Sequence, residues 1–352
     1  MGGTSSLASG RTVTRARLAI RMASARAHGR PFTLSHLITG RCNGHCPTCL
    51  WRDPEREELD TAAVKWLYQE AGRAGLAQLV VWGGEPLLRD DLPTLLRSAK
   101  DAGLATTLIS NGWLAAECWS GLRGSVDALI LSLDDVGPAH DRLRGLAGLS
   151  ERLEAFVASL HDDPQQPTLL VNTVLSRLNV GALARVAPVA KRWCAGLYFC
   201  PMETGDLTSA GFVARRGDLA LPADELRTAA RLAGDLKAKG YPILNTRAYL
   251  ELLARDPDLG SYTCRMPRAL LTVEADGALR DCRRSDRPLA NVRDLRTSGG
   301  GLSSVFSLSR RRALCAEASL CTKCNNPDVI ELSWLWDLRP AMLRKVAELA
   351  TR

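Results

Sequence analysis

Three cysteines near the start of the chain, Cys42, Cys46 and Cys49, follow one another at the spacing CxxxCxxC. Thiolates are soft ligands that suit iron–sulfur clusters. A cubane cluster contains four irons, so three cysteines from one short loop leave one iron able to bind a substrate. The alternative is a zinc ion, with His45 as the fourth ligand of a closed tetrahedral site.

A second set of cysteines lies in the last third of the chain, at Cys264, Cys282, Cys321 and Cys324. Four thiolates can enclose one cluster completely, although a CxxC pair is equally common in zinc sites. Cys315 is close in sequence, either as an alternate ligand or as a small buried residue. The chain has 11 cysteines, an odd number in short-spaced groups, which indicates metal binding in a reducing compartment rather than disulfides.

The elements that must position these residues alternate between strand and helix from residue 32 onward. Apolar runs predict strands at 34–38, 79–82, 106–109, 128–133, 169–174 and 196–199. Amphipathic stretches predict helices at 62–74, 92–102, 149–160, 180–193 and 223–239. Right-handed crossovers would curl such a sheet into an open barrel. The expected fold is therefore α/β, a partial (β/α)6 TIM-like barrel with a small C-terminal cysteine-rich α+β module.

The polar motifs of the first half follow the predicted strands. The first cysteine set follows the first strand, Gly83-Gly84-Glu85 the second, residues 110–112 the third and residues 132–134 the fourth. Functional residues of parallel barrels collect at the carboxyl ends of the strands. These motifs are therefore expected to meet at one edge of the sheet.

The cysteine spacing, the Gly-Gly-Glu-Pro motif and the later Ser-x-Asp stand in the order found in radical SAM enzymes, which residues 32–203 resemble. The resemblance implies that Cys42, Cys46 and Cys49 hold a 4Fe–4S cluster, whose fourth iron is chelated by the amino and carboxylate groups of S-adenosylmethionine. Reductive cleavage then produces a 5′-deoxyadenosyl radical that abstracts hydrogen from the substrate. The cofactor supplies the difficult chemistry, and the protein orients it and excludes water.

The same resemblance assigns a role to the turn after the second strand. Gly83, Gly84 and Glu85 would bind the methionine ammonium, with glycine required where a ligand approaches the backbone. The alternative is an ordinary turn with a solvated glutamate.

Three further polar residues are assigned through the resemblance. Ser132 would contact the ribose and Asn172 would lie beside it, while Arg144 would pair with the methionine carboxylate. The alternatives are satisfied interior polar groups for Ser132 and Asn172 and a surface ion pair for Arg144.

One position departs from the family pattern. The residue before the third cysteine is often aromatic, and here it is Thr48. Trp51 or Trp82 could take over the packing against adenine, although a tryptophan near a strand end also suits the core.

The second cysteine set resembles the twitch module, the shortened form of the SPASM domain. It implies one auxiliary 4Fe–4S cluster, held by Cys264, Cys282, Cys321 and Cys324, that relays electrons or helps to bind substrate. Cys200, at the end of the sixth strand, resembles the hydrogen-atom donor of some radical SAM epimerases. The alternative for Cys200 is a buried, inert thiol.

Both ends of the chain are amphipathic and basic. The net charge is +8, and no acidic residue precedes Asp53. A basic helix over residues 12–28 and a Trp-bearing helix over residues 333–352 would suit an anionic membrane surface, or would dock onto the barrel. No signal peptide or spanning segment is evident, so we expect a cytoplasmic protein with peripheral contact at the inner membrane face. No aromatic residue precedes Phe32, which disfavours nucleic-acid binding.

These features predict four regions: a basic N-terminal helical segment (1–31), a radical SAM barrel (32–255), an auxiliary cluster module (256–332) and a C-terminal helix (333–352). The expected activity is radical SAM oxidoreductase or transferase chemistry on a small molecule, with a lipid or isoprenoid favoured by the amphipathic ends. A peptide substrate is disfavoured, because only 31 residues precede the barrel. The alternatives are a sugar or aminoglycoside dehydrogenase or epimerase and, in a different class, a non-catalytic zinc or iron–sulfur protein. An electron donor such as flavodoxin or ferredoxin is the expected partner.

Overall fold

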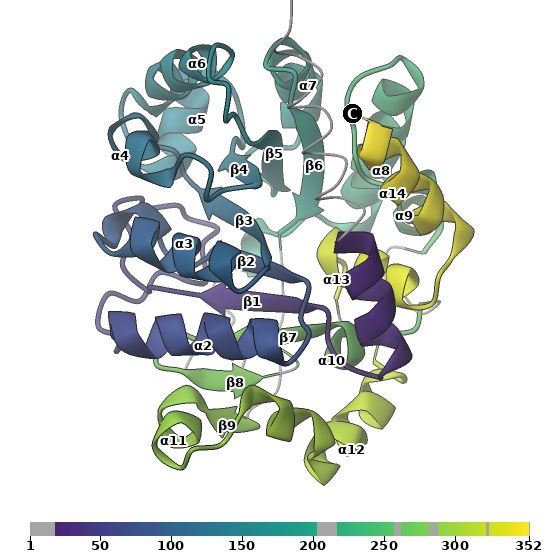
Figure 1. Cartoon of the computed structure of the whole chain (residues 1–352). Coiled ribbons are helices and arrows are strands. Elements are labelled where there is room, and N and C mark those ends of the chain that lie inside the picture. Colours follow the sequence, from purple (N-terminus) through teal and green to yellow (C-terminus); the bar gives the residue numbers. More distant parts are fainter. Residues whose placement is uncertain are drawn as a thin grey trace, which may run out of the picture.

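The computed structural model describes residues 18–202, 217–256, 262–280, 282, 288–321 and 324–351, with side chains described up to residue 346. Its nine strands form one sheet in the order β6-β5-β4-β3-β2-β1-β7-β8-β9 (Figure 1). The strands are β1 (Thr33–Leu37), β2 (Gln78–Trp82), β3 (Ala105–Ser110), β4 (Ala128–Ser132), β5 (Thr168–Leu175), β6 (Gly196–Pro201), β7 (Leu270–Val273), β8 (Ala278–Arg280) and β9 (Ala290–Asn291).

Strands β1 to β6 are parallel, as the alternating sequence pattern predicts, and each starts and ends within two residues of the predicted range. The sheet is open, so the prediction of a partial barrel is confirmed. The C-terminal strands extend the same sheet: β7 pairs in parallel with β1, and β8 and β9 continue it in antiparallel order. The second cysteine region is therefore built onto the β1 edge of the barrel.

Helices cover one face of the parallel sheet. They are α2 (Thr61–Arg73), α3 (Leu92–Asp101), α4 (Ala115–Leu122), α5 (Gly137–Arg144), α6 (Leu149–Leu160), α7 (Ala182–Arg192), α8 (Ala223–Ala238) and α9 (Arg247–Arg255). The periodicity predicted five of these. It missed α4, α5 and α9, which are eight or nine residues long and so make little more than two turns each.

Alternation along the strands separates a core face from an interior face. Leu34, Leu79, Leu129 and Phe199 belong to the large apolar cluster that also contains the core residues of the helices. Their neighbours along each strand point the other way, into the barrel. This interior face is where polar side chains from several strands come together.

The C-terminal region contains α10 (Met266–Ala269), α11 (Val292–Thr297), α12 (Ser309–Ala318), α13 (Pro327–Trp336) and α14 (Pro340–Thr351). The single helix predicted over residues 333–352 is therefore wrong. Leu338 adopts a positive φ of 54°, and Pro340 has no N–H to continue a helix. The chain breaks there into α13, which begins before the predicted range, and α14.

The helix of residues 18–27, purple in Figure 1, packs beside α13. Leu18, Met22 and Ala25 contact the cluster that contains Phe32 and Trp336. Arg26 Nε donates to the Trp336 carbonyl at 2.6 Å, which fixes this helix against the barrel. The part of the predicted basic helix before residue 18 lies outside the described residues.

The tryptophans expected on a membrane-facing surface are instead in the core. Trp334 is 4% exposed and Trp336 is 8% exposed, whereas Ile20, Leu343 and Val346 are exposed. Within the described ranges, no helix is both long and apolar enough to cross a membrane. Docking onto the barrel, the alternative for both ends of the chain, accounts for these buried side chains.

Candidate active site

The loop that carries the first cysteines is closed at its base. The Asp53 N–H donates to the Gly40 carbonyl at 2.9 Å, and a Cβ at Gly40 would lie 2.1 Å from the Asp53 carbonyl oxygen. Arg41 Nε donates to Glu58 Oε1 at 2.9 Å, and Thr39 donates to the same carboxylate. The loop is therefore held in place by backbone packing and a charged pair.

The three cysteines of this loop are near one another and partly accessible. Cys42 and Cys46 are half-buried and Cys49 is exposed. The N–H of Gly44 lies 3.3 Å from Cys42 Sγ, a contact that stabilises a thiolate. Burial raises the pKa of Cys42 to about 11, and the charges of Glu85, Cys46 and Cys49 act in the same direction. A bound metal would favour the deprotonated form of these sulfurs.

Three thiols from one short loop are ligands of the kind that an iron–sulfur cluster takes. Among the described residues, no three Cys, His, Asp or Glu side chains converge closely enough to hold one metal ion. A cluster spreads its thiolates over several irons and so needs a wider spacing than tetrahedral zinc. His45, the fourth ligand in the zinc alternative, is exposed.

The Gly83-Gly84-Glu85 turn packs directly against the cysteine loop. The N–H groups of Gly84 and Glu85 donate to the carbonyls of Thr39 and Arg41, both at 2.8 Å. A Cβ at Gly84 would lie 2.1 Å from the Arg41 oxygen, and one at Gly83 would lie 2.4 Å from the Thr39 oxygen. The neighbour that requires glycine here is thus the cysteine loop itself.

Glu85 is fully buried and hydrogen-bonded. Its carboxylate accepts from Ser110 Oγ at 2.8 Å and from the N–H groups of Asn111 at 2.7 Å and Leu87 at 3.0 Å. Burial raises the pKa of Glu85, while these hydrogen bonds oppose the shift. The solvated glutamate offered as the alternative is not what the structure contains.

Asn111 links Glu85 to the cysteines. Its Nδ2 donates to Asn43 Oδ1 at 2.8 Å and lies 4.0 Å from Cys42 Sγ. The sequence pointed to Asn111 only as part of a motif that follows β3, without assigning it a contact. Its position directly after a strand is the sequence feature that could have identified Asn111 as a site residue.

Arg144, the last residue of α5, lies inside the site and not on the surface. Its guanidinium pairs with Asp134 at 2.8 Å and places Nη1 3.8 Å from Cys46 Sγ. Asp134 follows β4 within the Ser-x-Asp motif, and its pairing with Arg144 was not predicted. The role of Arg144 toward the methionine carboxylate stays a prediction.

Ser132 and Asn172 are neighbours on adjacent strands. They are register partners across β4 and β5, and Asn172 is in turn the partner of Tyr198 on β6. All three are half-buried, on the interior face of the sheet. Cys200 lies two residues beyond Tyr198 on the same face, is 8% exposed, and contacts the Pro201 carbonyl at 3.4 Å. The structure thus brings Ser132 and Asn172 together, and their ligand roles and that of Cys200 stay predictions.

Trp51 and Trp82 pack on each other. Their ring centroids are 4.9 Å apart at 89°, and Trp82 Nε1 donates to Ser35 Oγ at 2.8 Å. Trp82 is therefore a core residue of the barrel interior, while Trp51 covers it beside Cys49.

The second cysteine set also comes together, from segments far apart in the sequence. Cys264 precedes α10, Cys282 follows β8, and Cys321 and Cys324 follow α12. Burial raises the pKa of Cys264 to about 12, with the nearby thiols of Cys282, Cys324 and Cys321 adding to the shift. Four cysteines are the number that can enclose one cluster, and Cys264 among them is buried.

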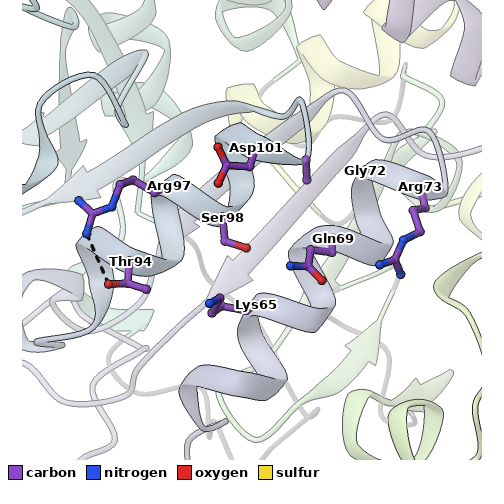
Figure 2. Close-up of a pocket in the computed structure, with 9 residues that line it drawn as sticks. Lys65, Gln69, Gly72, Arg73, Thr94, Arg97, Ser98 and Asp101 are labelled. Carbon is purple, nitrogen blue, oxygen red and sulfur yellow. Dashed lines mark hydrogen bonds between the residues drawn. The ribbon is translucent and has the colours of Figure 1, made fainter.

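A groove of about 660 Å³ lies elsewhere, on the outer surface between α2 and α3. Figure 2 shows Lys65 and Gln69 on α2 opposite Thr94 and Arg97 on α3. None of the predicted site residues lines it. Because it lies behind the helices and not at the strand ends, we do not assign the chemistry to it.

An open α/β barrel that gathers three thiols, a buried carboxylate and a guanidinium at its strand ends defines a class of cofactor-binding protein. The sequence profile of the radical SAM superfamily matches residues 37–162. Residues 37–162 thus resemble the radical SAM superfamily, and the predicted cofactors, a 4Fe–4S cluster and S-adenosylmethionine, are those of that class.

The curated relatives are peptide-modifying enzymes by name. The PqqA peptide cyclase of Xanthomonas axonopodis pv. citri is 33% identical over 171 residues, which are 47% of this chain and 45% of the relative. That of Granulibacter bethesdensis is 33% identical over 170 residues, 46% of this chain and 44% of the relative. The matches thus span about half the length of these relatives.

Solved structures share the fold at low sequence identity. Streptococcus suis SuiB bound to precursor peptide SuiA superposes with a TM-score of 0.63 and 15% identity, over 87% of this chain and 74% of SuiB. The enzyme anSMEcpe with bound AdoMet and Cp18Cys peptide gives a TM-score of 0.60 and 15% identity, over 91% of this chain and 99% of that chain. The likeness therefore includes the C-terminal region as well as the barrel.

Proposed function

We propose that this protein is a radical SAM enzyme that modifies a peptide. The observation that carries the proposal is the convergence at the strand ends of Cys42, Cys46 and Cys49 with the Glu85–Asn111 pair and Arg144. When bound, the cluster and S-adenosylmethionine supply a 5′-deoxyadenosyl radical. The protein's part is to hold both in one orientation and to exclude water.

Each interior residue receives a part in that arrangement. Cys42, Cys46 and Cys49 hold the cluster, and the Gly83–Glu85 turn supports their loop and lies where the methionine ammonium would bind. Ser132 and Asn172, side by side on β4 and β5, hydrogen-bond the ribose. Cys200 faces the same interior, where its S–H can donate a hydrogen atom to a substrate radical.

The second cysteine set holds one auxiliary 4Fe–4S cluster in this proposal. Cys264, Cys282, Cys321 and Cys324 supply four thiolates, which leave no iron open to a ligand. An enclosed cluster suits electron relay, and a flavodoxin- or ferredoxin-type donor would reduce the enzyme.

We propose a peptide as the substrate in place of the lipid or isoprenoid that the sequence analysis favoured. That expectation rested on amphipathic terminal helices, whose tryptophans are buried against the barrel. The expectation against peptides rested on the short segment before the barrel, yet the curated relatives are named peptide cyclases and two structural neighbours were solved with peptides. These names favour a peptide for this chain.

Anaerobic reconstitution tests the proposal. The iron-loaded protein, reduced with dithionite, should release 5′-deoxyadenosine from S-adenosylmethionine, and Cys46→Ala should abolish the release. Cys118→Ala, on α4, is the matched control and should leave it unchanged. Peptides encoded near the gene should gain or lose mass in the reaction, whereas isoprenoid and sugar candidates should not. Turnover of a lipid or sugar with no reaction on any peptide would overturn the choice of substrate.

A further inference from the structure

The loop with the first cysteines rests on the C-terminal end of α5. The Arg144 carbonyl accepts from the His45 N–H at 2.8 Å and lies 3.9 Å from Cys46 Sγ. Gly145 ends the helix at φ 64°, and a Cβ there would lie 3.0 Å from the His45 Cβ. The end of α5 and the cysteine loop are therefore in direct contact, so a substitution at the end of α5 can alter the surroundings of Cys46.

The Arg144 side chain places a positive charge beside the cluster ligand. Its side chain is 12% exposed, with Nη2 2.8 Å from Asp134 Oδ2 and Nη1 3.8 Å from Cys46 Sγ. Burial alone would lower the pKa of Arg144, but the charges of Asp134 and Cys46 raise it above its ordinary value, so the guanidinium stays charged. Its Nε is buried without a hydrogen-bond partner.

Asp134 is held in place independently of Arg144. Its Oδ1 accepts from the Val174 N–H at 2.8 Å, its own N–H donates to His140 Nδ1 at 3.1 Å, and its carbonyl accepts from Asn179 Nδ2 at 2.7 Å. Asp134 is 5% exposed, so little water screens its charge. The carboxylate is thus a fixed counter-charge for Arg144, which contacts Asp134 through Nη2 and Cys46 through Nη1.

We propose that Asp134 and Arg144 set the reduction potential of the cluster bound through Cys46. A cationic donor near a ligand sulfur stabilises the more negative, reduced cluster, and hydrogen bonds and local charge are established means of tuning such potentials. Asp134 moderates this effect by neutralising the guanidinium. The inference rests on the proposed function, because it requires a cluster at Cys42, Cys46 and Cys49.

The two residues should therefore act with opposite signs. Asp134→Asn leaves an uncompensated guanidinium beside Cys46 and should make the potential more positive. Arg144→Gln removes the cation, leaves the Asp134 charge near the cluster and should make it more negative. The double variant removes both charges and should return close to the starting value. A purely structural role would not produce opposite shifts that cancel.

The measurement is a potentiometric titration of the reconstituted full-length protein, followed by electron paramagnetic resonance without S-adenosylmethionine. Omitting that ligand separates this effect from any contact between Arg144 and a methionine carboxylate. Each single variant should change the equilibrium constant for one-electron reduction by about tenfold, or about 59 mV. Arg142→Gln, which removes the same charge from an exposed position of α5, is the control and should not shift the potential.

The possible results distinguish failure of the proposed function from failure of this inference. If the wild-type protein binds no iron at the first cysteines, the proposed function fails, and this inference fails with it. If the cluster forms and both single variants shift the potential in the same direction, or neither shifts it, only the inference is overturned. If Arg144→Gln does not load iron, Arg144→Met, a second uncharged replacement, takes its place. A more negative potential then supports the proposal and an unchanged one contradicts it.

Discussion

The two cysteine sets of this protein differ in what surrounds their sulfur atoms. Burial raises the pKa of both Cys46 and Cys264, but the charge of Arg144 opposes the shift at Cys46, whereas at Cys264 the opposing group is the backbone N–H of Met266. The first set is half-buried to exposed, at the ends of parallel strands. The difference teaches that the effect of burial on similar thiols can be opposed in two ways, by a side-chain charge in the first set and by a backbone N–H in the second.

The largest expected effect is on 5′-deoxyadenosine release, which should depend on the first cysteine set and not on the second. Cys46→Ala should lower the rate of 5′-deoxyadenosine release by more than about 100-fold, since loss of a ligand exceeds the 10- to 100-fold typical of its supporting partners. Cys324→Ala should retain most of that release while losing product formation, because the auxiliary set is not needed to cleave S-adenosylmethionine. Chromatography of nucleoside and product in the same reaction measures both. Equal loss of nucleoside release in the two variants would contradict the division of roles.

A smaller effect is expected from the packing that supports the first loop. Gly84→Ala would drive a Cβ to 2.1 Å from the Arg41 carbonyl and should lower the free energy of unfolding by about 1–3 kcal/mol or more. Gly234→Ala, within α8 and with no atom within 4 Å of the added Cβ, should instead raise it by about 0.5–1 kcal/mol. Urea unfolding under argon compares the two. An unchanged Gly84→Ala variant would mean that the turn and the cysteine loop are not in contact.

A substitution at Asn111 tests whether its hydrogen bonds help to hold the cluster bound by the first cysteine set. Asn111→Ala removes the hydrogen bond to Asn43 and the contact near Cys42 Sγ, and should speed iron loss to a chelator by about tenfold. Gln165→Ala, at an exposed position, is the control. Since the proposed auxiliary cluster is held by other cysteines, half of the iron should leave at the wild-type rate. Faster loss of all the iron would show that the two sets are coupled.

The smallest effect is a pH dependence confined to the base of the first loop. Burial favours the protonated form of Glu58, but its bonds to Arg41 and Thr39 outweigh this and lower its pKa below the ordinary value. A carboxylate with a lowered pKa stabilises the fold above its ordinary pKa and loses that contribution as pH falls through the folded-state value. Glu58→Gln should therefore cost about 1 kcal/mol or less at pH 7, and the difference from wild type should shrink as pH falls below the ordinary pKa of a glutamate. A difference that persists in acid would point to packing instead of charge.

Several features could be predicted because their physical signals are local. Apolar runs located the strands β1 to β6, and thiol spacing identified both cysteine sets. Failures occurred where the signal was short or interrupted: α4 and α5 are too brief to show a period, and Pro340 divides the expected C-terminal helix. Trp334 and Trp336 could be assigned to a membrane face or to the core from the sequence, and only packing against the barrel decided between them.

The sequence by itself determined which reactive residues the protein has and where they stand along the chain. They are two sets of cysteines, a glycine-rich turn and polar residues after successive strands. Only the tertiary structure decided which charges meet. Arg144 lies 98 residues after Cys46, yet the sheet brings it against that sulfur and against Asp134. The physical reason is that strand periodicity and metal-ligand spacing are encoded over a few neighbouring residues, whereas an ion pair depends on distance through space and on burial, which exist only once the chain has folded.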